Sequence, residues 1–214
     1  MRPIRLDIDL ATVDTDGIFE AQQLVGAGDV VLDGTEVVGG VWTSPDGFAK
    51  QIGIACAGDI NTVTFTITGF RDEAGQIAIT DTITGVNADT VESTEYFYSI
   101  TSIAADAAVG TDITGGAVDE AITRTIPLNW RGAECLVNVF VTGTINYTVQ
   151  QTTDDIGSLT DYNYNWKDCD DTDLVTATAT ANTTYVGVPT ALRLKVNSYS
   201  ADAELAFDII QRDI

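Results

Sequence analysis

The side chains best spaced to bind a metal ion in this chain lie in one acidic stretch, WKDCDDTD. It brings four aspartates close together in sequence: Asp168, Asp170, Asp171 and Asp173. Calcium takes several oxygen ligands, and carboxylates in a loop can supply them. The stretch departs from the EF-hand pattern, because a threonine and an aspartate stand where that loop needs Asp or Asn followed by Gly. The four residues are therefore weak candidates for a metal site, and a solvated acidic loop is the favoured interpretation.

Three aromatic residues alternate with asparagines in the neighbouring stretch YNYNW: Tyr162, Tyr164 and Trp166. In an extended chain, alternate side chains share one face. Aromatic side chains are enriched at the centres of protein interfaces, and they also stack against sugars. One interpretation is therefore a patch for a protein partner or a carbohydrate. The other is a strand or loop that closes over the core, and the sequence leaves both open.

The composition gives little support to enzymatic chemistry. The chain has no histidine, which excludes a Ser-His-Asp triad and a Cys-His pair. It also lacks a G-x-S-x-G elbow, a P-loop and a dinucleotide fingerprint. Paired carboxylates of the kind that hydrolyse glycosides carry no information here, because the chain has 32 acidic residues. We expect no enzyme, and we expect no cofactor.

The charge balance limits the classes of partner. The 32 acidic and 10 basic residues give a formal net charge of −22. Binding to DNA or RNA phosphates needs clustered Lys and Arg, and here they are scattered, so we expect no nucleic-acid partner. The sequence contains no apolar run of 18 residues, so it predicts no membrane span. The apolar positions near the start are interrupted by Asp7 and Asp9, unlike a secretory signal, so synthesis in a cytoplasm is expected.

The three cysteines occur at wide spacings and without a C-x-x-C motif, so a zinc or redox site is unsupported. Cys56 and Cys135 have apolar neighbours and are expected to be buried thiols. Cys169 lies in the acidic stretch and is expected to be exposed. The sequence leaves open whether two of the three cysteines form a disulfide.

Strands, rather than helices, must position these residues, because period-2 alternation is the dominant pattern. Residues 4–10 alternate apolar and charged side chains. Residues 62–69 and 76–85 alternate around the glycine-containing loop 71–75, which predicts a β-hairpin. Further strands are expected at 136–141, 144–150, 191–196 and 204–210. A short helix fits 18–24 about as well as a strand does, and 154–173 is expected to be mostly loop.

Many short strands at roughly ten-residue spacing predict an all-β fold, an antiparallel β-sandwich or jelly roll with little or no helix. We expect residues 1–214 to form one compact unit. The alternative is two packed halves, 1–105 and 122–214, joined by the Gly-, Ala- and Asp-rich segment 106–121, which is expected to be a long loop or a boundary between the halves.

Four stretches of this sequence resemble small structural proteins of tailed bacterial and archaeal viruses. They are FTITGFRDEAGQIAITDTITGVNADTV, YFYSITSI, NYTVQQTTDD and VPTALRLKVNSYSADAELAFDIIQ. The similarity covers most of 18–105 and 133–211, and it rests on strand and turn positions. Phe70 stands where such proteins often carry a small residue, and the segment 104–122 matches nothing in them.

The resemblance implies a virion structural protein, and within that class a capsid decoration or cement protein. Such a protein would be made in the host cytoplasm and would bind the outer face of the major capsid protein as a dimer or trimer. Residues 1–10 are the candidate arm for pairing with capsid strands, with Arg2 and Arg5 as its positive charges. The outer capsid surface also suits a chain of this charge, because the packaged genome would repel it.

Two alternatives remain beside the decoration protein. Tail, head–tail connector or fibre-attachment proteins of virions are built from similar β-sandwiches. A carbohydrate-binding β-sandwich module would use Tyr162, Tyr164 and Trp166 as its platform. The fold alone does not separate these functions.

Overall fold

The computed structural model describes residues 3–128, 134–156, 164–186, 189–200 and 202–211. Within these ranges the chain forms antiparallel β-sheets and one short 3-10 helix, which confirms the expected all-β fold of β-sandwich type. No helix in this part of the chain is long and apolar enough to cross a membrane. The chain divides into two compact units. Unit 1 comprises Met1–Thr12 and Ile122–Ile214, and unit 2 comprises Val13–Ala121.

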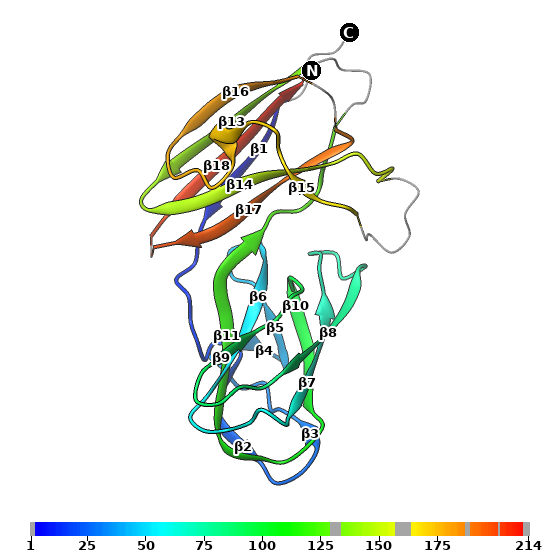
Figure 1. Ribbon diagram of the computed structural model, residues 1–214, viewed down its shortest axis with the longest axis vertical. Coiled ribbons are helices and arrows are strands. Elements are labelled where there is room, and N and C mark those ends of the chain that lie inside the picture. The colour runs from blue at the N-terminus through cyan, green and yellow to red at the C-terminus, as the bar shows by residue number, and fades with distance from the viewer. Residues whose placement is uncertain (1–2, 129–133, 157–163, 187–188, 201, 212–214) are drawn as a thin grey trace. The chain divides into compact units, whose positions relative to one another are not determined.

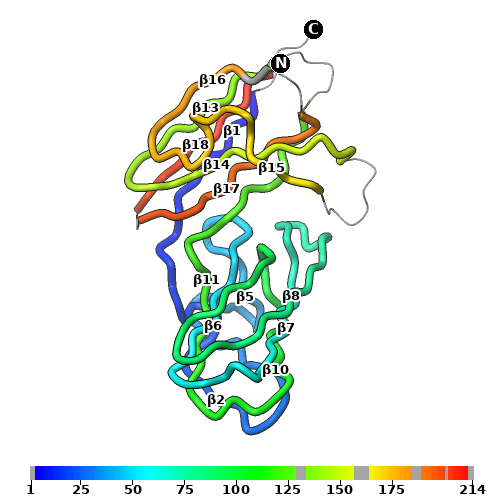
Figure 2. Tube along the Cα trace, viewed as in Figure 1, coloured from blue at the N-terminus to red at the C-terminus, as the bar shows by residue number. Residues whose placement is uncertain are grey.

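The first sheet of unit 1 joins the two ends of the chain. Its strand order is β1 (Ile4–Asp9), β18 (Glu204–Gln211), β13 (Glu134–Thr142) and β16 (Ala181–Val186). Figure 2 shows β1, in blue, running beside β18, in red. Residues 4–9 are therefore an edge strand of the sheet and not a free arm, which corrects the expectation for that segment. Arg2 lies outside the described residues.

The second sheet of unit 1 packs on the first, and Figure 1 shows the two as separate layers. It contains β15 (Lys167–Asp168), β14 (Ile145–Thr152), β17 (Ala191–Tyr199) and β12 (Ile126–Pro127). The 3-10 helix η1 (Thr172–Leu174) lies between β15 and β16 in the chain. Alternate residues of the longer strands are buried and form the core: Val137, Val139, Tyr147, Val149, Leu192, Leu194, Val196, Leu205, Phe207 and Ile209. This burial follows from the period of two.

Unit 2 is also built of two groups of paired strands. One follows the order β4 (Val37–Val38), β5 (Val41–Thr43), β10 (Ser99–Ala105), β7 (Thr64–Phe70) and β8 (Ala78–Thr84), with β3 (Gly28–Asp29) against β10. The other contains β2 (Phe19–Leu24), β11 (Val109–Ile122), β6 (Ala49–Cys56) and β9 (Thr90–Glu92). Their apolar side chains share one buried cluster that includes Trp42, Phe65 and Phe97.

The predicted hairpin at 62–85 is confirmed. Strands β7 and β8 pair from Thr64 opposite Thr84 to Phe70 opposite Ala78. The Asp72 carboxylate accepts the backbone N–H groups of residues 76 and 77, at 2.9 and 2.7 Å. Gly75 adopts a positive φ of 65°, which glycine tolerates without strain. Local sequence therefore specifies both the strands and the turn.

The expectation that 106–121 is a loop is wrong, because most of it belongs to β11, the longest strand. Two of the three glycines in this segment have a packing reason instead. A Cβ on Gly115 would lie 2.0 Å from a ring carbon of Phe19, and one on Gly116 would lie 2.0 Å from the carbonyl oxygen of Asp14. Glycine within a strand often marks such a close approach. The segment 18–24, open between helix and strand, is strand β2.

A buried ion pair lies where β6 leaves the turn at 45–47. Lys50 Nζ is 2.7 Å from Asp46 Oδ2, and the two side chains are 2% and 0% exposed. The other carboxylate oxygen accepts the Ser44 hydroxyl at 2.9 Å and the Phe48 backbone N–H at 3.3 Å. Buried charges are tolerated only when they are paired and hydrogen-bonded in this way. The pair therefore fixes the path of the chain into β6.

Replacing Lys50 with methionine should destabilise unit 2 strongly, because it removes the cation and leaves the buried carboxylate. We expect the free energy of unfolding to fall by about 3–5 kcal/mol, measured by urea denaturation. The control is Lys167→Met, which alters an exposed lysine of β15 and should change stability by less than about 0.5 kcal/mol. Equal effects of the two variants would contradict a stabilising role for the pair.

Candidate functional site

The cross-strand register places nine side chains in three rows on the exposed face of the first sheet of unit 1. From β1 through β18 to β13, the rows are Arg5, Asp208 and Asn138, then Asp7, Ala206 and Phe140, then Asp9, Glu204 and Thr142. Residues two apart along a strand point to the same face, so the three rows are neighbours. Charged side chains from β1 and β18 thus meet an aromatic ring from β13.

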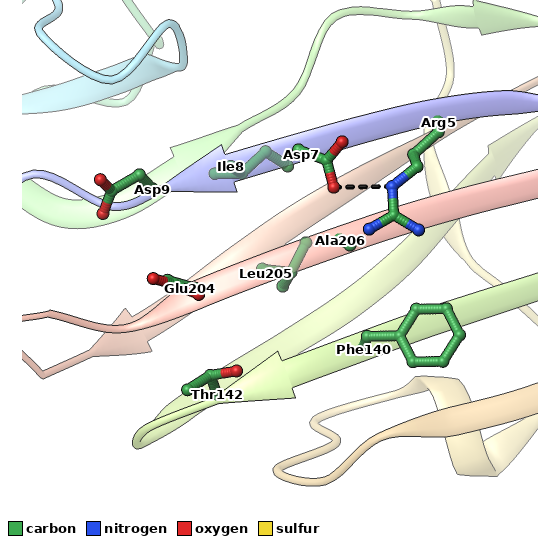
Figure 3. Close-up of a pocket in the computed structure, with 9 residues that line it drawn as sticks. All are labelled: Arg5, Asp7, Ile8, Asp9, Phe140, Thr142, Glu204, Leu205 and Ala206. Carbon is green, nitrogen blue, oxygen red and sulfur yellow. Dashed lines mark hydrogen bonds and ion pairs between the residues drawn. The ribbon is translucent and has the colours of Figure 1, made fainter.

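A groove of about 340 Å³ lies on this face. Figure 3 shows its lining, which comes from three strands: Arg5, Asp7, Ile8, Asp9, Phe140, Thr142, Glu204, Leu205 and Ala206. The middle row has only a methyl group at Ala206, between the larger side chains of Asp7 and Phe140. A small side chain at the centre of a sheet face leaves room that its neighbours do not fill.

The groove is acidic. Its lining carries three carboxylates, from Asp7, Asp9 and Glu204, against one guanidinium. Arg5 Nε donates to Asp7 Oδ1 at 2.7 Å, and Arg5 Nη1 lies 3.4 Å from Asp208 Oδ2. The hydrogen bond to Asp7 and the charge of Asp208 raise the pKa of Arg5. The guanidinium is therefore held as a cation among several anions.

Phe140 is the unusual member of this face, because its side chain is 44% exposed on an inner strand of the sheet. The neighbouring outward positions of β13 carry the polar residues Asn138 and Thr142. Single exposed apolar residues are common on protein surfaces, and this one is distinguished by its place beside the acidic groove. The face thus combines an aromatic contact with charged partners.

Two buried oxygen atoms on the same face have no donor among the described residues. They are Oδ1 of Asn138 and Oδ1 of Asp208, which come from directly opposed positions of β13 and β18. Asn138 is only 6% exposed although it points to the outer face. Buried acceptors are satisfied in most proteins, so an unsatisfied pair calls for an explanation.

Sequence reasoning found only Arg5 of this groove. The run LVNVFV of β13 is apolar at nearly every position, so its pattern does not tell which side chains face outward. The alternation in ELAFDII was a usable signal, because it separates Glu204, Ala206 and Asp208 from the buried residues between them. The register that joins these strands depends on contacts distant in sequence.

The aromatic candidates Tyr164 and Trp166 do not line the groove. Tyr164 and Trp166 meet edge to face with centroids 6.3 Å apart, and the Tyr164 hydroxyl donates to the Ile156 carbonyl at 3.0 Å. The guanidinium of Arg193 lies over the Trp166 ring, 4.5 Å from its centroid. A sugar would have to displace this cation–π contact from that face of the indole. Tyr162 lies outside the described residues.

The aspartates of the acidic stretch do not share one set of contacts. Asp168 accepts the Gln150 side-chain amide at 3.1 Å. Asp171 caps η1 by accepting the Asp173 backbone N–H at 3.0 Å, and it accepts the Thr183 hydroxyl at 2.5 Å. Asp170 is exposed. Among the described residues, no group of three or more His, Cys, Asp or Glu side chains converges so as to hold a metal ion.

The three cysteines are free thiols, and Cys169 is 5% exposed, so the expectation that it is exposed is wrong. Its Sγ points back to the Asp171 carbonyl at 3.4 Å, so the acidic loop covers it. Cys135 is buried as expected, whereas Cys56 is half-buried. Burial raises the pKa of Cys135 and of Cys169 to about 11.

No protein-family model matches this chain, and no curated protein matches it. The groove joins a cavity, clustered charge and an exposed aromatic ring on one face of the sheet. These are the attributes of a site for binding a cationic group.

Replacing Asp171 with alanine should destabilise unit 1, because η1 loses its cap and Thr183 loses its acceptor. We expect a loss of about 1–2 kcal/mol in the free energy of unfolding, measured by urea denaturation. The matched control is Asp170→Ala, which alters an exposed aspartate of the same stretch and should stay within about 0.5 kcal/mol of the parent. A purely solvated acidic loop would give the same small change for both variants.

The buried thiols should resist alkylation in the folded protein at pH 8. With a pKa near 11, Cys135 and Cys169 are about one part in a thousand thiolate at that pH. We expect iodoacetamide to leave both unmodified for the time in which it modifies all three cysteines in concentrated urea, as read by peptide mass spectrometry. Equal rates for either thiol with and without urea would show that burial does not protect it.

Proposed function

We propose that this protein is a structural component of a virion, a capsid decoration or cement protein that binds the outer face of the major capsid protein. The observation that carries the proposal is the acidic groove beside Phe140 on the exposed sheet face of unit 1. It offers a binding surface on the sheet. The resemblance of the strand and turn sequences to small virion proteins supports the same class.

The charge of the protein favours the outside of a shell. A chain of net charge −22 is repelled by packaged nucleic acid and needs a basic surface patch on its partner. Binding to assembled shells but not to dissociated subunits stabilises the shell by mass action. Interfaces made by several copies around a symmetric shell would favour a dimer or trimer of this chain.

The carbohydrate-binding alternative has less support, because Arg193 covers one face of Trp166 and Tyr164 meets its edge. Sugar-binding platforms present an open ring face.

Immunogold labelling of intact virions from the source of this sequence tests the proposal. We expect gold distributed over the head, with no label when the antibody is first absorbed with the purified protein. Gold confined to one vertex or to the tail would instead indicate a connector or fibre role. Unlabelled particles that also lack the protein by mass spectrometry would refute a virion role.

A further inference from the structure

We propose that the groove on the exposed face of unit 1 is a binding site for an arginine side chain, presented by a basic segment of a partner protein. The inference rests on the proposed function, because it names the chemistry by which the capsid subunit would be recognised. It also defines a site that can be tested on the isolated protein.

Charge complementarity selects a cation. The lining has three carboxylates and one guanidinium, and Asp208 adds a further carboxylate in the adjoining row. The carboxylates come from two neighbouring strands, so a cation in the groove would be flanked from both sides. An anionic ligand would be repelled by the excess of carboxylates.

Phe140 selects arginine over lysine. A guanidinium is planar and weakly hydrated, so it stacks on an aromatic face while its edge donates to carboxylates. The chain already contains such a contact, since Arg193 lies over Trp166 and its Nε donates to Gln150 at 2.8 Å. In the groove, the incoming guanidinium would stack on the Phe140 ring as Arg193 does on Trp166. Its N–H groups would donate to the carboxylate of Glu204 or Asp9.

Asn138 Oδ1 and Asp208 Oδ1 are buried acceptors from opposed positions of β13 and β18, in the row next to the groove and outside its lining. The five N–H donors of an incoming guanidinium would therefore be met by the carboxylates that line the groove.

In the unbound protein, the guanidinium of Arg5 pairs with carboxylates in and beside the groove that would otherwise bind the partner's arginine. Its side chain is 54% exposed, and its contact with Asp208 is long, at 3.4 Å. The hydrogen bond from Arg5 Nε to Asp7 is short, at 2.7 Å, but both side chains are more than half exposed. Exposed ion pairs contribute little free energy, so the guanidinium can move aside when a partner's arginine enters. Arg5 would therefore compete with the partner, and its removal should strengthen binding.

The test is a titration of the purified full chain with the peptide acetyl-Thr-Arg-Thr-Arg-Thr-amide in about 0.15 M salt, which screens diffuse attraction. Binding is read from the backbone amide shifts of β1, β13 and β18. The same peptide with citrulline in place of arginine keeps the shape and lacks the charge. We expect it to bind at least about tenfold more weakly.

Four variants distinguish the groove from general attraction to an acidic protein. Phe140→Ala and Asp9→Asn should each weaken binding by about threefold or more, and Asp29→Asn, an exposed aspartate of unit 2, should leave it unchanged. Arg5→Ala should strengthen binding severalfold, whereas Arg124→Ala, which removes the same charge from another exposed position, should not.

Equal binding of the two peptides would overturn the inference. So would equal effects of Asp9→Asn and Asp29→Asn, or of Arg5→Ala and Arg124→Ala. The experiment needs no capsid, so its outcome is separate from the labelling of virions. Peptide binding in the groove with unlabelled heads would keep the arginine site and refute decoration, and labelled heads without peptide binding would refute the arginine site alone.

Discussion

The register between β1, β18 and β13 is the constraint on which both the core and the groove of unit 1 depend. Leu6 opposes Phe207 on the buried side, while Arg5 opposes Asp208 on the exposed side. Because side chains alternate with a period of two, a slip of one residue would turn Phe207 to solvent and bury Asp208. The burial of apolar area that holds the sheet together therefore also fixes the chemistry of its outer face.

Local sequence patterns predicted those elements that are specified by residues close together in the chain. The β7–β8 hairpin follows from alternation and from the turn at Asp72 and Gly75, and β1 follows from alternation alone. The strand β11 was missed because Gly115 and Gly116 make room for the Phe19 ring and for the backbone at Asp14 and Thr15, contacts that the sequence does not reveal. Strand β6 lacked a clear alternation, and the partner of its buried Lys50 lies in the preceding turn. The groove required a pairing between the two ends of the chain.

Acidic residues do different work in the two units. In unit 2, Asp46 is buried and neutralised by Lys50, so charge there serves the interior of the fold. In unit 1, the carboxylates of the groove face solvent and are only partly compensated by Arg5. Self-repulsion at the surface reduces stability but creates a field that attracts a basic partner. The excess of acids is thus compatible with folding because the charges inside are matched.

The division of unit 1 into two segments has a consequence for synthesis on the ribosome. Arg5 and Asp208, which face each other across β1 and β18, are 203 residues apart in the chain. At ordinary translation rates of about 5–20 residues per second, β1 waits on the order of 10–40 s for its partner, while unit 2 can already fold. An unpaired strand invites aggregation during such a delay, and charges along it oppose that. Arg5, Asp7 and Asp9 therefore protect the nascent chain before they line a groove.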